Sequence, residues 1–194
     1  MPRKKQPKTT GEQGIYPTLF ALVAREGWWT LTLPKIARAA KIPLAELLKT
    51  APDKNALLAG FAAQLDQKLA QAELEEGDTL KERLFEVIMR RFELMQPYRA
   101  GFSRLMEDLI RNPAGALCLG LELSPVARRS LRLVLELAEF PVARRMIEPA
   151  ILGLKLVMLY TFRTWKDDAS ADLSPTMAAL DRALDRYLSF LRLS

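Results

Sequence analysis

Apolar residues recur every three or four positions along most of the chain, which is the spacing that places them on one face of an α-helix. In the segment 79–96, for example, Leu84, Ile88 and Phe92 share a face, and Thr79 and Glu82 ahead of them match the capping box of a helix start. Apolar and polar residues do not alternate in the way that β-strands require. The pattern predicts an all-α protein of about nine helices, at 15–26, 33–41, 44–50, 54–74, 80–96, 98–111, 113–138, 142–166 and 175–193.

Polar residues that cap helices stand ahead of several of these segments. Thr32 and Asp53 precede the segments 33–41 and 54–74, and each offers a side-chain oxygen to the first free backbone N–H groups. Ser174 is followed by a proline, a pair that commonly opens a helix. We therefore expect N-caps at these three residues.

Two short helices near the N-terminus fit a helix-turn-helix. The segments 33–41 and 44–50 are each about two turns long, and Ile42 with the proline after it makes a tight break between them. Ala37 is expected where the two helices cross, because a small side chain lets the backbones approach, and Leu47 is expected to fill the space below. In such a unit the first helix braces the second across the major groove of DNA.

The excess positive charge of the chain is confined to its first quarter. Residues 1–54 carry ten basic and four acidic side chains and residues 55–194 carry nineteen of each, so the net charge of +6 belongs to the N-terminal part. Residues 1–13 are polar and lack a periodic apolar pattern, so we expect a disordered basic arm there. A polyanion is the natural partner of such a region.

The residue types that most enzymes and metal sites need are scarce in this sequence. It has no histidine, a single cysteine at Cys118, and neither a glycine-rich phosphate loop nor a nucleophile elbow. Acidic pairs do occur, but sequence neighbours on a helix point apart. We therefore expect no enzyme activity, no metal and no cofactor, and we expect solvent-exposed charges at Glu75-Glu76, Glu107-Asp108 and Asp167-Asp168.

No segment has the pattern of a secretory signal or of a membrane span. The apolar run 156–160, for example, lies between Lys155 and Arg163 and is far shorter than the roughly 20 residues that a span requires. A single cysteine also leaves no intrachain disulfide. We expect a cytoplasmic protein without stable membrane insertion.

Four stretches near the N-terminus carry a family resemblance. They are Arg25-Glu-Gly-Trp28, Leu33-Pro-Lys-Ile-Ala-Arg-Ala-Ala-Lys-Ile42, Leu47-Leu48, and Asp53-Lys54 with the following Leu57-Leu58. Together they resemble the TetR family of transcriptional regulators, to which the rest of the chain is similar in helix number and length. The resemblance implies a homodimer with a DNA-binding domain at 14–54 and a ligand-binding and dimerisation domain at 55–194. The sequence departs from the family where Lys41 replaces the usual turn glycine, and where Leu48 and Ala51 replace an aromatic pair.

The helix-turn-helix offers more groups for phosphates than for bases. Leu44, Ala45 and Glu46 stand where a base-reading helix usually carries Arg, Asn, Gln or Ser. Nearby lysines and threonines suit phosphate contacts, and the basic arm suits an adjacent minor groove. A helix-turn-helix kept only for packing stays open as an alternative. The expected DNA-binding residues are Arg3, Lys4, Lys5, Lys8, Thr32, Lys35, Lys41, Leu44, Ala45, Lys49, Thr50 and Lys54.

Two segments of the second half, 84–101 and 165–181, carry another resemblance. They resemble the TetR-fold lipid-binding accessory proteins of ubiquinone biosynthesis. This implies an alternative function, in which the chain holds a lipid or isoprenoid and its helix-turn-helix is vestigial. Those proteins have a further amphipathic helix after the equivalent of 175–193, whereas this sequence stops at Ser194, so we expect no membrane-docking element.

Both resemblances imply an apolar pocket among the middle helices, and the TetR fold implies a dimer interface on the last two. Methionine and phenylalanine at helical spacing suit a pocket, although they are also typical of a plain core. The expected pocket residues are Met89, Phe92, Met95, Phe102, Leu105, Met106 and Leu109, and the expected dimer residues are Leu156, Leu159, Tyr160, Leu180, Leu184 and Tyr187. We expect a repressor that leaves its operator when a small hydrophobic effector binds.

Overall fold

The computed structural model describes residues 12–75, 77–141 and 146–191, and within these ranges the chain is helical without strands. The all-α prediction is confirmed. The elements are α1 (Glu12–Glu26), α2 (Leu33–Ala39), α3 (Leu44–Thr50), α4 (Lys54–Ala70), α5 (Leu80–Met95), the 3₁₀ helix η1 (Gln96–Tyr98), α6 (Arg99–Arg111), α7 (Pro113–Leu137), α8 (Ile147–Trp165) and α9 (Ser174–Leu191).

Most helix ends lie within two residues of their predicted positions, and α4 is the main exception. It ends at Ala70, four residues before the predicted end, because Gln71, Glu73 and Glu75 are exposed and give a further turn little to pack on. The predicted start of the eighth helix falls on 142–145, outside the described residues. No helix in the described ranges is long and apolar enough to cross a membrane.

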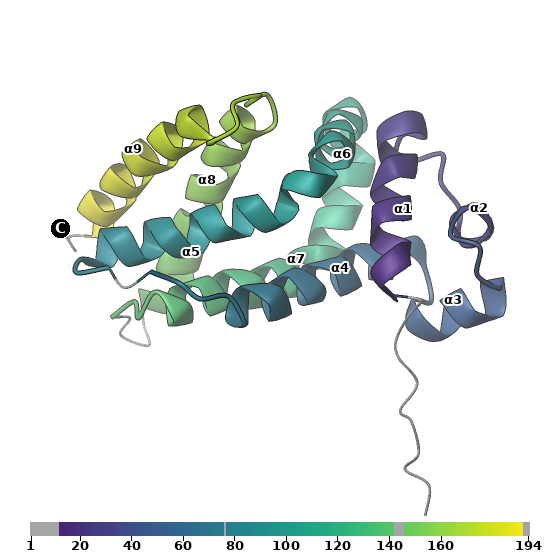
Figure 1. Ribbon diagram of the computed structural model, residues 1–194, viewed down its shortest axis with the longest axis horizontal. Helices are drawn as coiled ribbons and strands as arrows, with labels where there is room; N and C mark the ends of the chain where they lie inside the picture. The colour runs from purple at the N-terminus through teal and green to yellow at the C-terminus, as the bar shows by residue number, and fades with distance from the viewer. Residues whose placement is uncertain (1–11, 76, 142–145, 192–194) are drawn as a thin grey trace, which may run out of the picture.

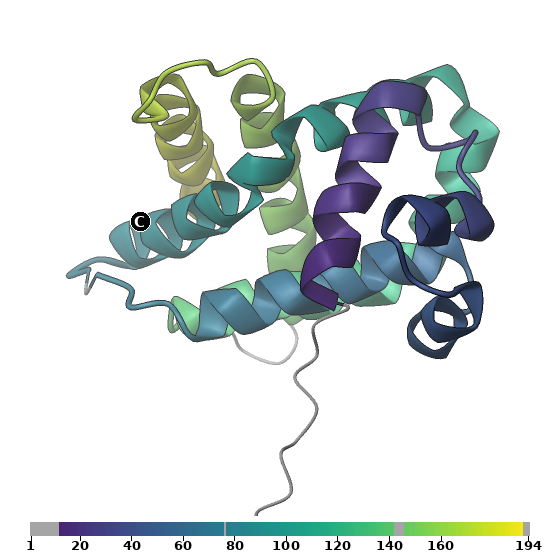
Figure 2. The ribbon, with the colours of Figure 1, turned by 45° about the vertical axis from the view of Figure 1, so that its right-hand side comes forward.

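The helix-turn-helix and the last two helices lie at opposite ends of the molecule. Figure 1 shows α1, α2 and α3 at one end and α8 and α9 at the other, with α4, α5 and α7 running between them. α1 packs along α6, α4 along α7, and α8 along α9, and Figure 2 shows α1 and α6 side by side from a second direction. The N-terminal unit is thus joined to the larger bundle by two of its neighbours, α4 and α6.

An aromatic cluster fills the joint between the two parts. The ring of Phe20 on α1 lies 4.6 Å from both Phe61 on α4 and Phe102 on α6, measured between ring centroids. Tyr98 completes the cluster at 4.8 Å from Phe61. Gly101 lets α6 approach closely, because a Cβ there would lie 2.6 Å from the backbone oxygen of Phe20.

The predicted caps are only partly correct. The capping box is confirmed, since the Glu82 N–H donates to Thr79 Oγ1 at 3.2 Å and the Thr79 N–H donates to Glu82 Oε2 at 2.9 Å. Asp53 also caps α4, through a 2.8 Å bond from the Ala56 N–H. Thr32 occupies the N-cap position of α2, but its side chain makes no capping bond, so only its backbone oxygen serves the first turn.

The start of α9 depends on a buried carboxylate rather than on Ser174. Asp168 accepts four hydrogen bonds, from the N–H and hydroxyl of Ser170 at 3.0 and 2.5 Å and from the N–H and hydroxyl of Thr176 at 3.0 and 2.5 Å. Burial raises its pKa, but the bonds from Ser170 and Thr176 prevail and lower the pKa to about 2. Ser174 is the first helical residue and donates to Asp172. The expectation that Asp168 is a solvent-exposed charge is therefore wrong.

Candidate nucleic-acid interface

In the turn between α2 and α3, a lysine occupies the left-handed C-terminal position of a helix that glycine usually occupies. Lys41 has φ of 57°, in the left-handed region that favours glycine. Its N–H bonds the Arg38 oxygen at 3.2 Å, and the Ile42 N–H bonds the Ala37 oxygen at 3.0 Å. These two bonds form a Schellman motif, which satisfies the last carbonyls of α2. The backbone thus adopts the turn that the family usually makes with glycine, although the side chain differs.

The two helices of the motif cross on small and apolar residues, as expected. Ala37 and Ile36 of α2 are buried, and Leu47 is the only residue of α3 that is buried. The rest of α3 faces outward, including Leu44 and Leu48, which are 38% and 46% exposed. α3 therefore presents nearly its whole surface to solvent, as a helix that enters a groove must.

The lysines expected at this surface differ in whether they form ion pairs within the chain. Lys35 forms an ion pair with Glu26, and Lys49 forms one with Glu46 at 3.1 Å. Exposed pairs of this kind contribute little stability and exchange readily for a phosphate. Among the described residues, Lys41 has no ion-pair partner. Of the other expected residues, Thr32, Ala45 and Thr50 are exposed, whereas Arg3, Lys4, Lys5 and Lys8 lie outside the described residues.

Sequence reasoning missed Arg38, which lies on α2 one turn before Lys41. Its side chain is exposed, and no ion pair to it occurs in the described part of the chain. The signal was present, because Arg38 comes directly after the buried Ile36 and Ala37 and so points away from the core. Arg38 on α2 and Lys41 in the turn before α3 are thus two exposed cations without an ion-pair partner in the described part of the chain.

Lys54 is not available to DNA in the way the sequence predicted. Its ammonium group donates to the backbone oxygens of Trp28 at 2.9 Å and Leu31 at 3.3 Å, and it lies 4.9 Å from the Trp28 ring centroid. Burial lowers its pKa. A cation held in this way fastens the loop between α1 and α2 to the start of α4, so we correct its role from phosphate contact to structural support.

The same loop is fastened to α6 by a buried carboxylate. Asp108 accepts a 2.5 Å hydrogen bond from the Trp28 N–H and a 3.1 Å bond from Arg104 Nε, while the Trp29 indole donates to its backbone oxygen at 3.1 Å. Asp108 is 6% exposed, which corrects the expectation of a solvated charge. The helix-turn-helix is therefore attached to the larger bundle by two charged groups, one on α4 and one on α6.

The residues expected to line a pocket lie in the core. Met89, Phe92, Met95 and Leu105 are buried, and Phe102, Met106 and Leu109 are half-buried. Phe92 packs against Trp165 with ring centroids 5.5 Å apart. None of the seven lines any of the four main hollows on the described part of the surface, whose walls come from other residues.

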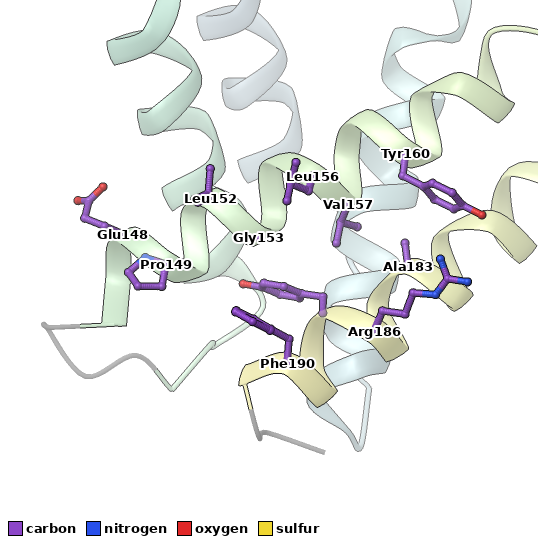
Figure 3. Close-up of a pocket in the computed structure, with 11 residues that line it drawn as sticks. Glu148, Pro149, Leu152, Gly153, Leu156, Val157, Tyr160, Ala183, Arg186 and Phe190 are labelled. Carbon is purple, nitrogen blue, oxygen red and sulfur yellow. The ribbon is translucent and has the colours of Figure 1, made fainter.

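The largest of these hollows is an apolar groove between α8 and α9. It has a volume of about 840 Å³, and Figure 3 shows side chains of both helices along it, with Pro149 and Phe190 towards one end and Tyr160 and Arg186 towards the other. Leu152, Leu156 and Phe190 are 61%, 60% and 78% exposed. Such exposure of neighbouring large apolar residues is typical of an interaction surface.

The groove separates the expected dimer residues into two groups. Leu156, Leu159 and Tyr160 are exposed, whereas Leu180 and Leu184 are fully buried inside the chain and have no surface left for a partner. Tyr187 lines the groove, and its hydroxyl donates to the Ala150 oxygen at 2.9 Å. Burial raises the Tyr187 pKa. Leu152 and Phe190 also line the groove, and sequence reasoning did not name them although both follow the helical spacing of the residues that it named.

Two solved structures have folds similar to that of this chain. A TetR transcriptional regulator from Rhodococcus sp. RHA1 superposes with a TM-score of 0.62 at 13% identity, over 91% of this chain and 94% of that one. A TetR-family transcriptional regulator from Streptomyces coelicolor gives 0.59 at 17% identity, over 94% of this chain and 83% of that one. No protein-family model and no curated protein sequence matches the chain. The chain therefore has the TetR-type fold, and neither structure supports the resemblance to ubiquinone accessory proteins.

Proposed function

We propose that this protein is a homodimeric transcriptional regulator that binds double-stranded DNA through α2 and α3. The observation that carries the proposal is the exposed α3 beside Arg38 and Lys41, two cations without ion-pair partners in the described part of the chain. A cation without a partner in its own chain binds a phosphate without first breaking an ion pair. The excess positive charge of the first 54 residues also favours binding to the phosphate backbone of DNA.

Contacts with the backbone outweigh base reading in this proposal. α3 exposes Leu44, Ala45 and Leu48, and apolar side chains in a major groove contact the methyl group of thymine. Glu46 is paired with Lys49 and, as an acceptor, could contact only the amino group of a cytosine or an adenine. The operator is accordingly expected to have few strongly specified positions.

Dimerisation is proposed to occur through the groove between α8 and α9. Leu152, Leu156 and Phe190 together leave an apolar surface that needs cover in water. A two-fold axis through this face brings the same residues of two copies together, as closed dimers require. Two α3 helices then face one duplex and read an inverted repeat.

Effector control is proposed to act through the two attachments of the helix-turn-helix. Lys54 on α4 and Asp108 on α6 both bind the loop between α1 and α2, so a ligand that moves either helix changes the position of α3. Such coupling is reciprocal, and DNA must weaken effector binding by the factor by which the effector weakens DNA binding. We propose that the protein is a repressor released in this way.

A salt titration with random duplex DNA tests the DNA-binding proposal. The logarithm of the binding constant should fall linearly with the logarithm of the salt concentration, and Arg38→Ala or Lys41→Ala should each reduce the slope by about 1 for each subunit bound, or about 2 for the dimer. Lys68→Ala on the exposed far end of α4 is the matched control and should leave the slope unchanged. No binding at low salt, or equal effects of Lys68→Ala and Arg38→Ala, would overturn the proposal.

A further inference from the structure

A second hollow, of about 290 Å³, lies between α4, α5, α7 and α8. Its walls are mainly apolar, with Leu58 from α4, Leu123 and Leu131 from α7 and Met158 from α8. Two cationic side chains, Arg91 from α5 and Lys155 from α8, also line it. The hollow thus combines an apolar wall with two positive charges, whereas Arg186 is the one cation among the described residues that line the groove between α8 and α9.

Arg91 is held at the wall by a buried network. Its Nη1 donates to Asp66 Oδ1 at 2.6 Å, and Asp66 Oδ2 accepts from the Ser130 hydroxyl at 2.6 Å. Arg91 is 9% exposed, and a guanidinium carries five N–H groups, of which one is used here. Its other donors have no partner among the described residues, so they remain available to a ligand.

The charges that face the hollow leave one positive charge without a counter-ion. Asp66 neutralises Arg91, whereas Lys155 has no ion pair within the described ranges. A ligand with one negative charge would balance Lys155 and share the free donors of Arg91. Guanidinium groups suit carboxylates because two parallel N–H bonds match the two oxygens.

We propose that this hollow binds a small amphipathic carboxylate, with its carboxylate between Arg91 and Lys155 and its hydrocarbon chain against Leu123, Leu131 and Met158. At about 30 Å³ for each water-sized group, the volume holds about ten non-hydrogen atoms, which is the size of octanoate. A hollow of this size lies at the small end of ligand pockets. The inference rests on the proposed function in one respect, since it identifies the effector of that regulator.

Occupancy of this site reaches the helix-turn-helix through α4. A carboxylate on the free donors of Arg91 shares the guanidinium charge with Asp66, which lies on α4 three turns beyond Lys54. Lys54 in turn binds the backbone oxygens of Trp28 and Leu31 beside the DNA-binding unit. The ligand therefore weakens a link between α4 and α5 at one end of a helix whose other end supports α2 and α3.

Calorimetric titration of the full-length protein with octanoate tests the site in the absence of DNA. Octanoate should bind saturably, and Lys155→Met should weaken it by about tenfold, because a charge-assisted bond is lost while the apolar length is kept. 1-Octanol lacks the charge, so Lys155→Met should leave its binding unchanged. Lys68→Met on α4 is the matched control, because Lys68 is exposed like Lys155 but does not line the hollow. This variant should bind octanoate as the unaltered protein does.

Three results would overturn the proposal: no saturable octanoate binding, equal weakening by Lys155→Met and Lys68→Met, or equal affinities for octanoate and 1-octanol. Arg91→Lys is a second variant. It keeps a positive charge next to Asp66 but removes the planar set of donors, so it should weaken the binding of octanoate more than the binding of 1-octanol. The calorimetry contains no DNA, so it can fail while the salt titration still supports DNA binding. Equally, the salt titration can fail while octanoate still binds in the hollow.

Discussion

The backbone N–H of Trp28 donates to the buried carboxylate of Asp108 at 2.5 Å, and this bond joins residues that lie 80 positions apart. It connects the loop after α1 with α6, and Lys54 of α4 binds the backbone oxygen of the same residue, Trp28. A charge-assisted bond in a buried place contributes more to stability than a surface pair. The position of the helix-turn-helix therefore depends on a few identifiable atoms.

Gly27→Ala tests this joint directly. Gly27 has φ of 84°, and a Cβ there would lie 2.7 Å from Asp108 Oδ2, so the added methyl group strains the backbone and displaces the carboxylate. Denaturant unfolding should show a loss of about 1–3 kcal/mol. Gly120→Ala, on an exposed part of α7 with nothing within 4 Å, is the control and should gain up to about 1 kcal/mol. Equal stabilities of the two variants would contradict the account of the joint.

Lys41→Gly should stabilise the turn between α2 and α3. A residue with a Cβ at φ of 57° carries a cost of about 1 kcal/mol that glycine avoids. Thermal unfolding should place Lys41→Gly about 2–4 °C above Lys41→Ala. Both variants remove the same charge, so their difference isolates the backbone effect. A melting temperature for Lys41→Gly at or below that of Lys41→Ala would count against the left-handed turn.

The network around Asp168 predicts acid sensitivity. Its folded pKa of about 2 lies below the ordinary value of 3.8, so the carboxylate contributes stability that is complete above about pH 5 and is lost as the pH falls through 3.8 towards 2. The difference in unfolding free energy between the protein and Asp168→Asn should be constant above about pH 5 and narrow below about pH 4. A difference independent of pH down to 2 would show that the network does not bind the ionised form.

Leu152→Glu should abolish dimerisation. Leu152 is 61% exposed in the groove between α8 and α9, and a charge there must lose its hydration when a second copy covers it. Sedimentation equilibrium should report a monomer for this variant and a dimer for the unaltered protein. Leu121→Glu, 68% exposed on α7 away from the groove, should remain dimeric. A dimer with Leu152→Glu and a monomer with Leu121→Glu would place the interface on α7 instead.

The sequence predicts the helices well because their apolar faces, caps and prolines are local features. The buried roles of Asp108, Asp168 and Lys54 are not local, since each depends on a backbone group that a distant helix brings near. Periodicity also does not separate core from pocket.

The predicted pocket residues and the buried Leu184 have the same helical spacing as truly exposed positions such as Leu156. The surroundings of Arg91 also cannot be predicted from helical spacing, because only the fold shows that it lines a hollow with Lys155. Composition alone therefore located the basic quarter of the chain, but it did not separate the cations that are free from those that support the fold.

Selection of bound fragments from a randomised duplex library tests the central claim most directly. A dimer that presents two α3 helices should enrich an inverted repeat whose half-sites are a whole number of helical turns apart, with about 10 base pairs per turn. Conserved positions should be few, with thymine where Leu44 and Leu48 face the groove. Retained fragments without an inverted repeat, or no retained DNA at low salt, would contradict the account.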